Sequence, residues 1–128
     1  MKVPADLKYT ESHEWTKAAD EGIIVGITDY AQSEMGDIVF ADLPQVGAEY
    51  KKGESLAVIE SVKAVSDIYA PVGGTVIAVN EALIDSPELI NDDCYGEGWL
   101  IKLSPDTEAE LDELLSAEEY EKLLEREG

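Results

Sequence analysis

The sequence predicts a mainly β domain with short helices, in which two small sheets face each other as a flattened barrel or sandwich. Strand and turn signals alternate from Gly47 to Leu103, residues 53–60 can be laid on residues 73–80, and the tail after residue 104 has helical spacing. A chain of 128 residues fits a single domain. We expect that domain to span residues 1–128, with a β core over about residues 1–104 and a helical segment over about residues 105–128.

The first elements expected are a hairpin and a short helix. Residues 14–17 and 22–27 are expected to be strands on either side of the turn-forming stretch ADEG. Thr28 or Asp29 can cap a helix that reaches Met35 and stops at Gly36. Residues 37–42 then form a strand that ends at Leu43 and Pro44.

The remaining strands follow at short intervals. Residues 55–60 and 66–70 form two of them, a turn at residues 71–74 leads into a strand at 75–79, and a long polar loop precedes a closing strand at 99–103. In the internal repeat, glycine opens both copies and apolar residues coincide at three places. Two similar sheets facing each other explain this match, although shared β composition explains it nearly as well.

The tail is expected to form two short amphipathic helices. Thr107 to Glu110 and Ser116 to Glu119 both fit the capping box, in which Ser or Thr is followed three residues later by Glu. Apolar residues at helical spacing follow in two groups, which are Leu111, Leu114 and Leu115, then Tyr120, Leu123 and Leu124. Both stripes are expected to pack on the β core.

Charge and composition exclude several classes of function. With 29 acidic and 9 basic residues, the formal net charge of −20 repels phosphate backbones and anionic lipids and favours basic protein surfaces as partners. The single cysteine, Cys94, has no internal disulfide partner, and no signal peptide, transit peptide or membrane-length apolar run is visible. We therefore expect a cytoplasmic monomer that binds neither nucleic acid nor membrane.

The same count speaks against an enzyme. His13 is the only histidine, Cys94 lies far from it in sequence, and no metal-ligand spacing, GxSxG elbow or glycine-rich phosphate loop is present. Carboxylates are so abundant that chance pairs carry little information. We expect neither a catalytic site nor a metal site.

Lys63 lies between two predicted strands in a chain with few cations. A tight turn with this lysine at its tip would point the amine into water, because an unpaired ammonium is costly to bury. Ser61 and Ala64 are small and leave room for approach. An exposed amine is mostly protonated at neutral pH, so attachment of a prosthetic arm would need a dedicated ligase that removes the proton. By spacing alone, however, an exposed lysine is most often only a surface charge.

The stretch from Glu60 to Ala64, with Ala70, Pro71 and Gly74 after it, resembles a lipoyl attachment hairpin. More narrowly, nearly the whole chain resembles the H-protein family of the glycine cleavage system. The matching segments, in family order, are SHEW (12–15), GITDYAQ (26–32), GDIV (36–39), DLP (42–44), VG (46–47), VN (79–80), PELIN (87–91) and YGEGW (95–99).

This resemblance implies a barrel-sandwich hybrid fold, with lipoate joined to Lys63 as an amide by a lipoate ligase or octanoyltransferase. The arm would accept an aminomethyl group from the pyridoxal-phosphate-dependent glycine decarboxylase (P protein) and carry it to the tetrahydrofolate-dependent aminomethyltransferase (T protein). A flavin-dependent dihydrolipoamide dehydrogenase (L protein) would then reoxidise the arm. Glu60 matches the family's acidic residue three before the lysine, which implies a role in recognition by the lipoylating enzyme.

The family also shelters the loaded arm in a cleft, because water would decompose the aminomethyl stage. The matching positions are Ser12, Glu14 and Asp67, where the carboxylates would pair with the ammonium and Ser12 would accept a hydrogen bond. Many members have histidine where this chain has Tyr30 and Glu34, so arm contacts at these two positions do not carry over.

Three rival functions remain open at the level of sequence. A biotin carrier uses the same fold, but its lysine usually lies between two methionines, whereas Val62 and Ala64 flank Lys63. An acyl-carrying domain of a 2-oxoacid dehydrogenase typically has Asp before the lysine and Pro/Ala-rich linkers, both missing here. A non-catalytic lipoate relay between enzymes is the third.

Overall fold

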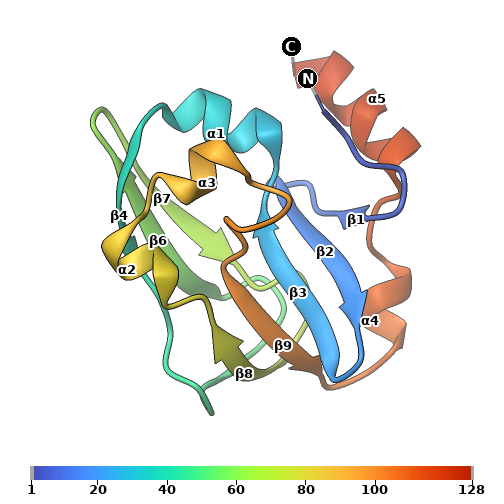
Figure 1. The fold of residues 1–128 in the computed structure, drawn as a ribbon. Coiled ribbons are helices and arrows are strands. Elements are labelled where there is room, and N and C mark those ends of the chain that lie inside the picture. The colour runs from blue at the N-terminus through green and yellow to red at the C-terminus, as the bar shows by residue number, and fades with distance from the viewer. Residues whose placement is uncertain (1, 128) are drawn as a thin grey trace.

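The computed structural model describes residues 2–127 as two antiparallel sheets with short helices around them (Figure 1). One sheet has six strands in the order β1-β2-β3-β9-β8-β5, and the other has three in the order β4-β6-β7. The strands are β1 (Lys8–Tyr9), β2 (Glu14–Ala19), β3 (Gly22–Ile27), β4 (Ile38–Asp42), β5 (Glu49–Tyr50), β6 (Ser55–Ser61), β7 (Val65–Tyr69), β8 (Gly74–Val79) and β9 (Ile101–Pro105). The predicted mainly β class with short helices is confirmed.

The helices are α1 (Asp29–Met35), α2 (Ala82–Asp85), α3 (Leu89–Asp92), α4 (Ala109–Asp112) and α5 (Ala117–Glu127). The predicted first helix is confirmed at both ends. Thr28 caps α1 by accepting a hydrogen bond from the Ala31 amide, and Gly36 ends it with φ 79°, a left-handed conformation that suits glycine. Within residues 2–127, no helix combines the length and the apolar character that crossing a bilayer requires.

The internal repeat falls on both sides of the core. Its first copy forms β6 in the three-stranded sheet, and its second copy forms β8 in the six-stranded sheet. Ile59 from β6 and Val76 from β8 are both buried in one hydrophobic cluster, together with Val25 from β3. The repeat therefore corresponds to two facing sheets, each of which contributes its apolar face to a common core.

The segment between β8 and β9 differs from the expected polar loop. It contains α2 and α3, and the closing strand begins at Ile101 instead of Trp99. The Asn80 side chain donates to the carbonyls of Glu97 and Trp99, at 2.7 and 2.8 Å, and so holds Trp99 outside the ladder. The two-residue strands β1 and β5 were not predicted: β1 pairs with the next strand, β2, and β5 pairs with the more distant β8.

The two expected capping boxes have different outcomes. Ser116 and Glu119 form one: the Ser116 hydroxyl accepts from the Glu119 amide, and the Glu119 carboxylate accepts from the Ser116 amide. The Thr107 box is wrong, since α4 has no side-chain cap. Its Glu110 carboxylate instead accepts a hydrogen bond from the Gly73 amide at 2.8 Å, so a long-range contact has taken the place of the local one.

Candidate functional site

Lys63 lies in the turn that joins β6 to β7. The Ser61 amide donates to the Ala64 carbonyl at 2.8 Å, and the Ser61 hydroxyl accepts from the amides of Ala64 and Lys63 at 3.0 and 3.3 Å. Glu60 and Val65 form the last strand pair below the turn. Lys63 is exposed, and within residues 2–127 its ammonium takes part in no hydrogen bond or ion pair. The turn thus presents a free amine on a well-ordered base.

The base of this turn is fixed to the connection between α1 and β4. The Val62 amide donates to the Asp37 carbonyl at 3.1 Å. The Lys63 side chain runs over Gly36, where an added Cβ would lie 3.3 Å from the lysine Cε. Figure 1 shows the tip of the β6–β7 hairpin beside the end of α1. Glycine at this position therefore leaves room for the lysine stem as well as ending the helix.

A small cavity of about 180 Å³ lies between α1 and β7. We call it the α1 cavity. Its wall includes Ser12 and Asp67, and also Tyr30 and Glu34, the two positions at which the sequence departs from the family pattern. Hydrogen bonding to Glu34 raises the pKa of Tyr30. Met35, the residue before Gly36, also lines the cavity.

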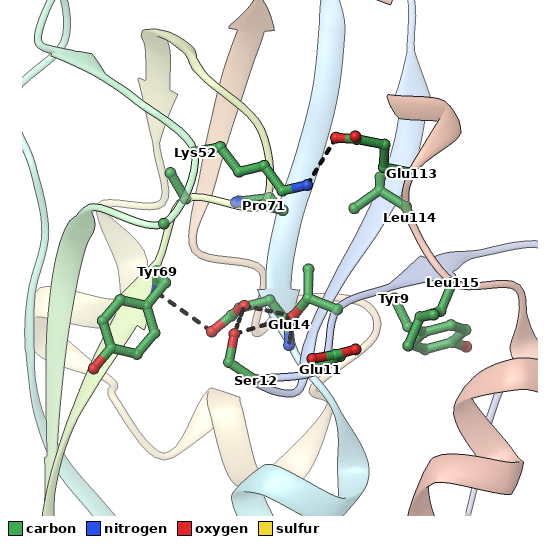
Figure 2. A pocket seen from close by; sticks show the side chains of 13 residues that line it. Tyr9, Glu11, Ser12, Glu14, Lys52, Tyr69, Pro71, Glu113, Leu114 and Leu115 are labelled. Carbon is green, nitrogen blue, oxygen red and sulfur yellow. Dashed lines mark hydrogen bonds and ion pairs between the residues drawn. The ribbon is translucent and has the colours of Figure 1, made fainter. Parts of the chain in front are cut away.

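Glu14 lies on the other side of Ser12, in a larger cleft of about 520 Å³. This α4 cleft is formed by the start of β2, the end of β7 and the chain around α4 (Figure 2). The Lys52 ammonium and the Glu113 carboxylate face each other across it at 2.9 Å. Ser12 lines both the α1 cavity and the α4 cleft, and the two meet at this residue.

The Glu14 carboxylate is 1% exposed and well supplied with hydrogen bonds. The hydroxyls of Thr10 and Ser12 both donate to its Oε1 at 2.6 Å, and the Tyr69 amide donates to its Oε2 at 3.3 Å (Figure 2). Burial raises the pKa of Glu14, and these hydrogen bonds oppose that shift. Glu14 is therefore a buried carboxyl group that three hydrogen bonds hold in a fixed position.

The residues predicted for the cleft are brought together only in part. Ser12 contacts Glu14 directly, and it shares the α1 cavity with Asp67. The Asp67 side chain is exposed and accepts a hydrogen bond from the Ser55 hydroxyl at 2.8 Å, a neighbour on β6. Glu14 thus lines the α4 cleft and Asp67 lines the α1 cavity, on either side of Ser12.

His13 lies beside the predicted site residues, although the sequence analysis did not include it among them. It lines the α1 cavity, has φ 71°, and its ring packs against Tyr30 at a tilt of 36°, with ring centroids 4.7 Å apart. Its Nδ1 lies 2.8 Å from the Tyr120 hydroxyl, and its Nε2 lies 3.1 Å from a Glu127 oxygen. A positive φ is uncommon outside glycine, so this ring is held in place by its partners on α5.

The sequence analysis also did not assign Thr10 or Gly36 to the site. Thr10 binds the Glu14 carboxylate, while Gly36 makes room for the lysine stem. A threonine four residues before a glutamate and a glycine after a short helix are both too common to indicate a site. Only the folded arrangement distinguishes them from ordinary turn residues.

Other chemistry has little support in the described part of the chain. Cys94 is buried, and burial raises the pKa of its thiol to about 12, so it is not a ready nucleophile. Residues 2–127 hold no group of three or more His, Cys, Asp or Glu side chains arranged to bind a metal ion.

Comparison with known proteins gives one consistent result. The family model described as Glycine cleavage H-protein matches residues 7–127. A glycine cleavage system H protein from Carboxydothermus hydrogenoformans is 60% identical over 126 residues, which covers 98% of this chain and 97% of that protein. One from Alkalilimnicola ehrlichii is 55% identical over 124 residues, which covers 96% of this chain and 95% of that protein.

The fold agrees with the sequence match. The crystal structure of a glycine cleavage system H protein from Mycobacterium marinum superposes with a TM-score of 0.86 at 42% identity. The match covers 94% of this chain and 97% of that one. The two facing sheets and their surrounding helices are therefore the fold of that protein as well.

Proposed function

Because the chain belongs to the glycine cleavage H-protein family, we propose that Lys63 is the residue that holds its lipoyl group. The observation that carries this assignment is the exposed ammonium of Lys63, which has no partner among residues 2–127, at the tip of an ordered hairpin. The lysine fits the group sterically, since Gly36 leaves its stem room and small residues flank the turn. The whole chain, residues 1–128, would then act as one lipoyl-carrier domain.

The protein is a lipoyl carrier of the glycine cleavage system and not an enzyme. Its partners are the P, T and L proteins of that system and the enzyme that attaches lipoate. The lipoyl group, when bound, supplies a redox-active disulfide that carries the aminomethyl group between enzymes. The chain itself holds the arm, orients it and shields its end from water. We place this activity in the cytoplasm.

Attachment at Lys63 is an acyl transfer. The ammonium first loses a proton to the attaching enzyme, and the neutral Nζ attacks the carbonyl carbon of an acyl adenylate or acyl thioester. The new N–C bond forms while the bond to AMP or to the carrier thiol breaks, and the second proton leaves the nitrogen. The turn contributes an amine without a competing carboxylate partner among residues 2–127, so no ion pair has to be broken first.

We further propose that Ser12, Glu14 and Asp67 shelter the loaded end of the arm. The Lys63 stem lies over Gly36, and from there the arm would reach the α1 cavity, which has Ser12 and Asp67 in its wall. Glu14 accepts a hydrogen bond from the Ser12 hydroxyl, and its buried carboxyl group would pair with the ammonium of the loaded arm. Glu60, exposed and three residues before the lysine, would serve recognition by the attaching enzyme.

The attachment site is tested by acylation followed by mass spectrometry. Purified protein is incubated with a lipoate ligase, lipoate and ATP, and the Lys63 peptide is expected to gain one lipoyl increment. Lys63→Arg should remain unmodified, whereas Lys17→Arg, an exposed lysine on β2, should be modified like wild type. Modification of the Lys63→Arg protein, or a biotinyl increment on the protein isolated from cells, would refute the assignment.

The carrier role has its own readout. Lipoylated protein is added to glycine decarboxylase, and exchange of labelled carbon dioxide with the glycine carboxyl is followed. Exchange should depend on the lipoylated form and should be absent with Lys63→Arg.

To test the sheltering cleft, the lifetime of the aminomethyl-loaded form is compared among wild type, Glu14→Ala and Asp67→Ala. Unchanged lifetimes in both variants would remove these residues from the proposed cleft.

A further inference from the structure

We propose that the outer face of the three-stranded sheet is the docking surface for the enzyme that acylates Lys63. We call this face, which carries Phe40, Val65 and Asp42 beside Glu60, the hairpin face. The partner it fits has an apolar contact surface bordered by lysine and arginine side chains. This proposal rests on Lys63 as the attachment site and adds the surface by which that site is found.

The strand register brings these side chains into rows. Phe40 of β4 is paired with Glu60 of β6, and Glu60 is paired with Val65 of β7. The adjacent row, Ala41, Ile59 and Ser66, turns inward, with Ile59 fully buried in the core. Successive residues of a strand point to opposite faces, so the row at Glu60 must point outward.

The outward-facing row at Glu60 includes large apolar side chains that are exposed to solvent. Phe40 is 52% exposed and Val65 is 68% exposed, and they lie on the two sides of Glu60. Val62, in the turn next to Lys63, is 71% exposed. Single exposed apolar residues are ordinary, but a row across three strands beside a modification site indicates a surface that another protein covers.

Charge determines the kind of partner. Asp42, Glu60 and Asp67 are all exposed on these strands, and β4, β6 and β7 contain no lysine or arginine. Lys63 at the tip is the cation next to this face. A basic rim on the partner would complement the acidic groups and increase the association rate, and such pairing weakens as salt is added.

Geometry distinguishes the acylating enzyme from the other partners. Its active site must reach Nζ itself, so it has to cover the turn and the strand ends next to it. The other enzymes act on the far end of a flexible arm and can bind at a distance from the lysine. Contacts at Phe40 and Val65 are therefore expected to matter most for acylation.

The test measures acylation kinetics as protein concentration is varied. Val65→Ala is compared with Val46→Ala, the same change at a residue that is 62% exposed in the loop between β4 and β5. We expect Val65→Ala to raise KM about fivefold and Phe40→Ala about tenfold or more, with kcat within about twofold. Val46→Ala should behave like wild type. Circular dichroism and thermal unfolding verify that each variant is folded.

Charge reversal provides a second measurement on the same face. Asp42→Lys should raise KM for acylation, and added salt should raise KM for wild type more than for this variant. Equal KM values for Val65→Ala and Val46→Ala in a folded, acylatable protein would overturn the docking proposal alone. A raised KM only in the glycine decarboxylase assay would assign the face to that enzyme and overturn our choice of partner. Absence of acylation in wild type would instead refute Lys63 as the attachment site.

Discussion

Removing one hydroxyl group, in Tyr120→Phe, tests whether α5 holds the wall of the α1 cavity in place. Tyr120 is fully buried, and its ring stacks on Tyr9 with centroids 4.7 Å apart, a contact that phenylalanine keeps. Its hydroxyl lies 2.8 Å from His13 Nδ1 and 2.7 Å from the Thr28 hydroxyl. The substitution therefore removes two hydrogen bonds and little packing.

The expected loss of stability follows from the buried Thr28 hydroxyl, which loses a hydrogen-bond partner. Thr28 is fully buried, and after the change its hydroxyl keeps only the longer contact from the Ala31 amide at 3.3 Å. Leaving a buried polar group poorly paired costs about 1–3 kcal/mol. We expect Tyr120→Phe to lower the free energy of unfolding by about 2 kcal/mol and Tm by about 7 °C for a chain of this size.

Urea unfolding followed by tryptophan fluorescence, with thermal unfolding alongside, measures this loss. Tyr69→Phe is the matched control, because Tyr69 is exposed and its hydroxyl makes no hydrogen bond within residues 2–127, so it should change stability by less than about 0.5 kcal/mol. If Tyr120→Phe were as stable as this control, the pairing of α5 with His13 and Thr28 would carry no energy and the reasoning would fail.

Three further outcomes follow from the same contacts. Gly26→Ala should destabilise the fold by about 1–3 kcal/mol in urea unfolding, because its Cβ would lie 2.6 Å from ring atoms of the buried Trp15; stability equal to wild type would contradict this. Lys63→Gln should abolish lipoylation in the mass assay yet change stability by less than about 0.5 kcal/mol, since its ammonium has no partner among residues 2–127; a larger loss would indicate a structural role. Burial raises the pKa of Glu14 above its ordinary value of 4.5, so the folded state holds this proton more tightly than the unfolded chain does. That stabilisation disappears as pH rises through the folded pKa. The Tm of Glu14→Gln relative to wild type should therefore rise as the pH increases above 4.5, and a constant difference would show that the buried carboxyl group is not the cause.

Elements with a local cause were predictable in advance. The hairpin of β2 and β3, the cap of α1 at Thr28 and the second capping box at Ser116 all depend on residues within a few positions of one another. The same holds for the exposed turn at Lys63, which follows from two strand signals and small neighbours. A prediction from local sequence was wrong where a residue distant in the chain offered another hydrogen bond. At Glu110, the carboxylate accepts from the Gly73 amide and does not take part in a cap of α4.

The family resemblance predicted which residues belong to the site, but it did not predict how they are arranged. It indicated Ser12, Glu14 and Asp67 as a group, whereas the structure places Glu14 and Asp67 in the walls of different hollows. Thr10 and His13 take part in the same region without any sequence signal that separates them from other surface residues. Their roles come from partners on β2 and α5.

The sequence by itself determined the class of fold, the position of the hairpin and the lysine at its tip, because each follows from neighbours along the chain. Tertiary structure alone decided which of the 29 acidic residues is buried, namely Glu14, and gave it the Tyr69 amide, 55 positions away, as a partner. It also decided that Phe40 and Val65 flank Glu60, since that row exists only in the register of β4, β6 and β7. The physical reason is that burial and pairing are properties of surfaces that meet on folding, and no local pattern encodes which surfaces those will be.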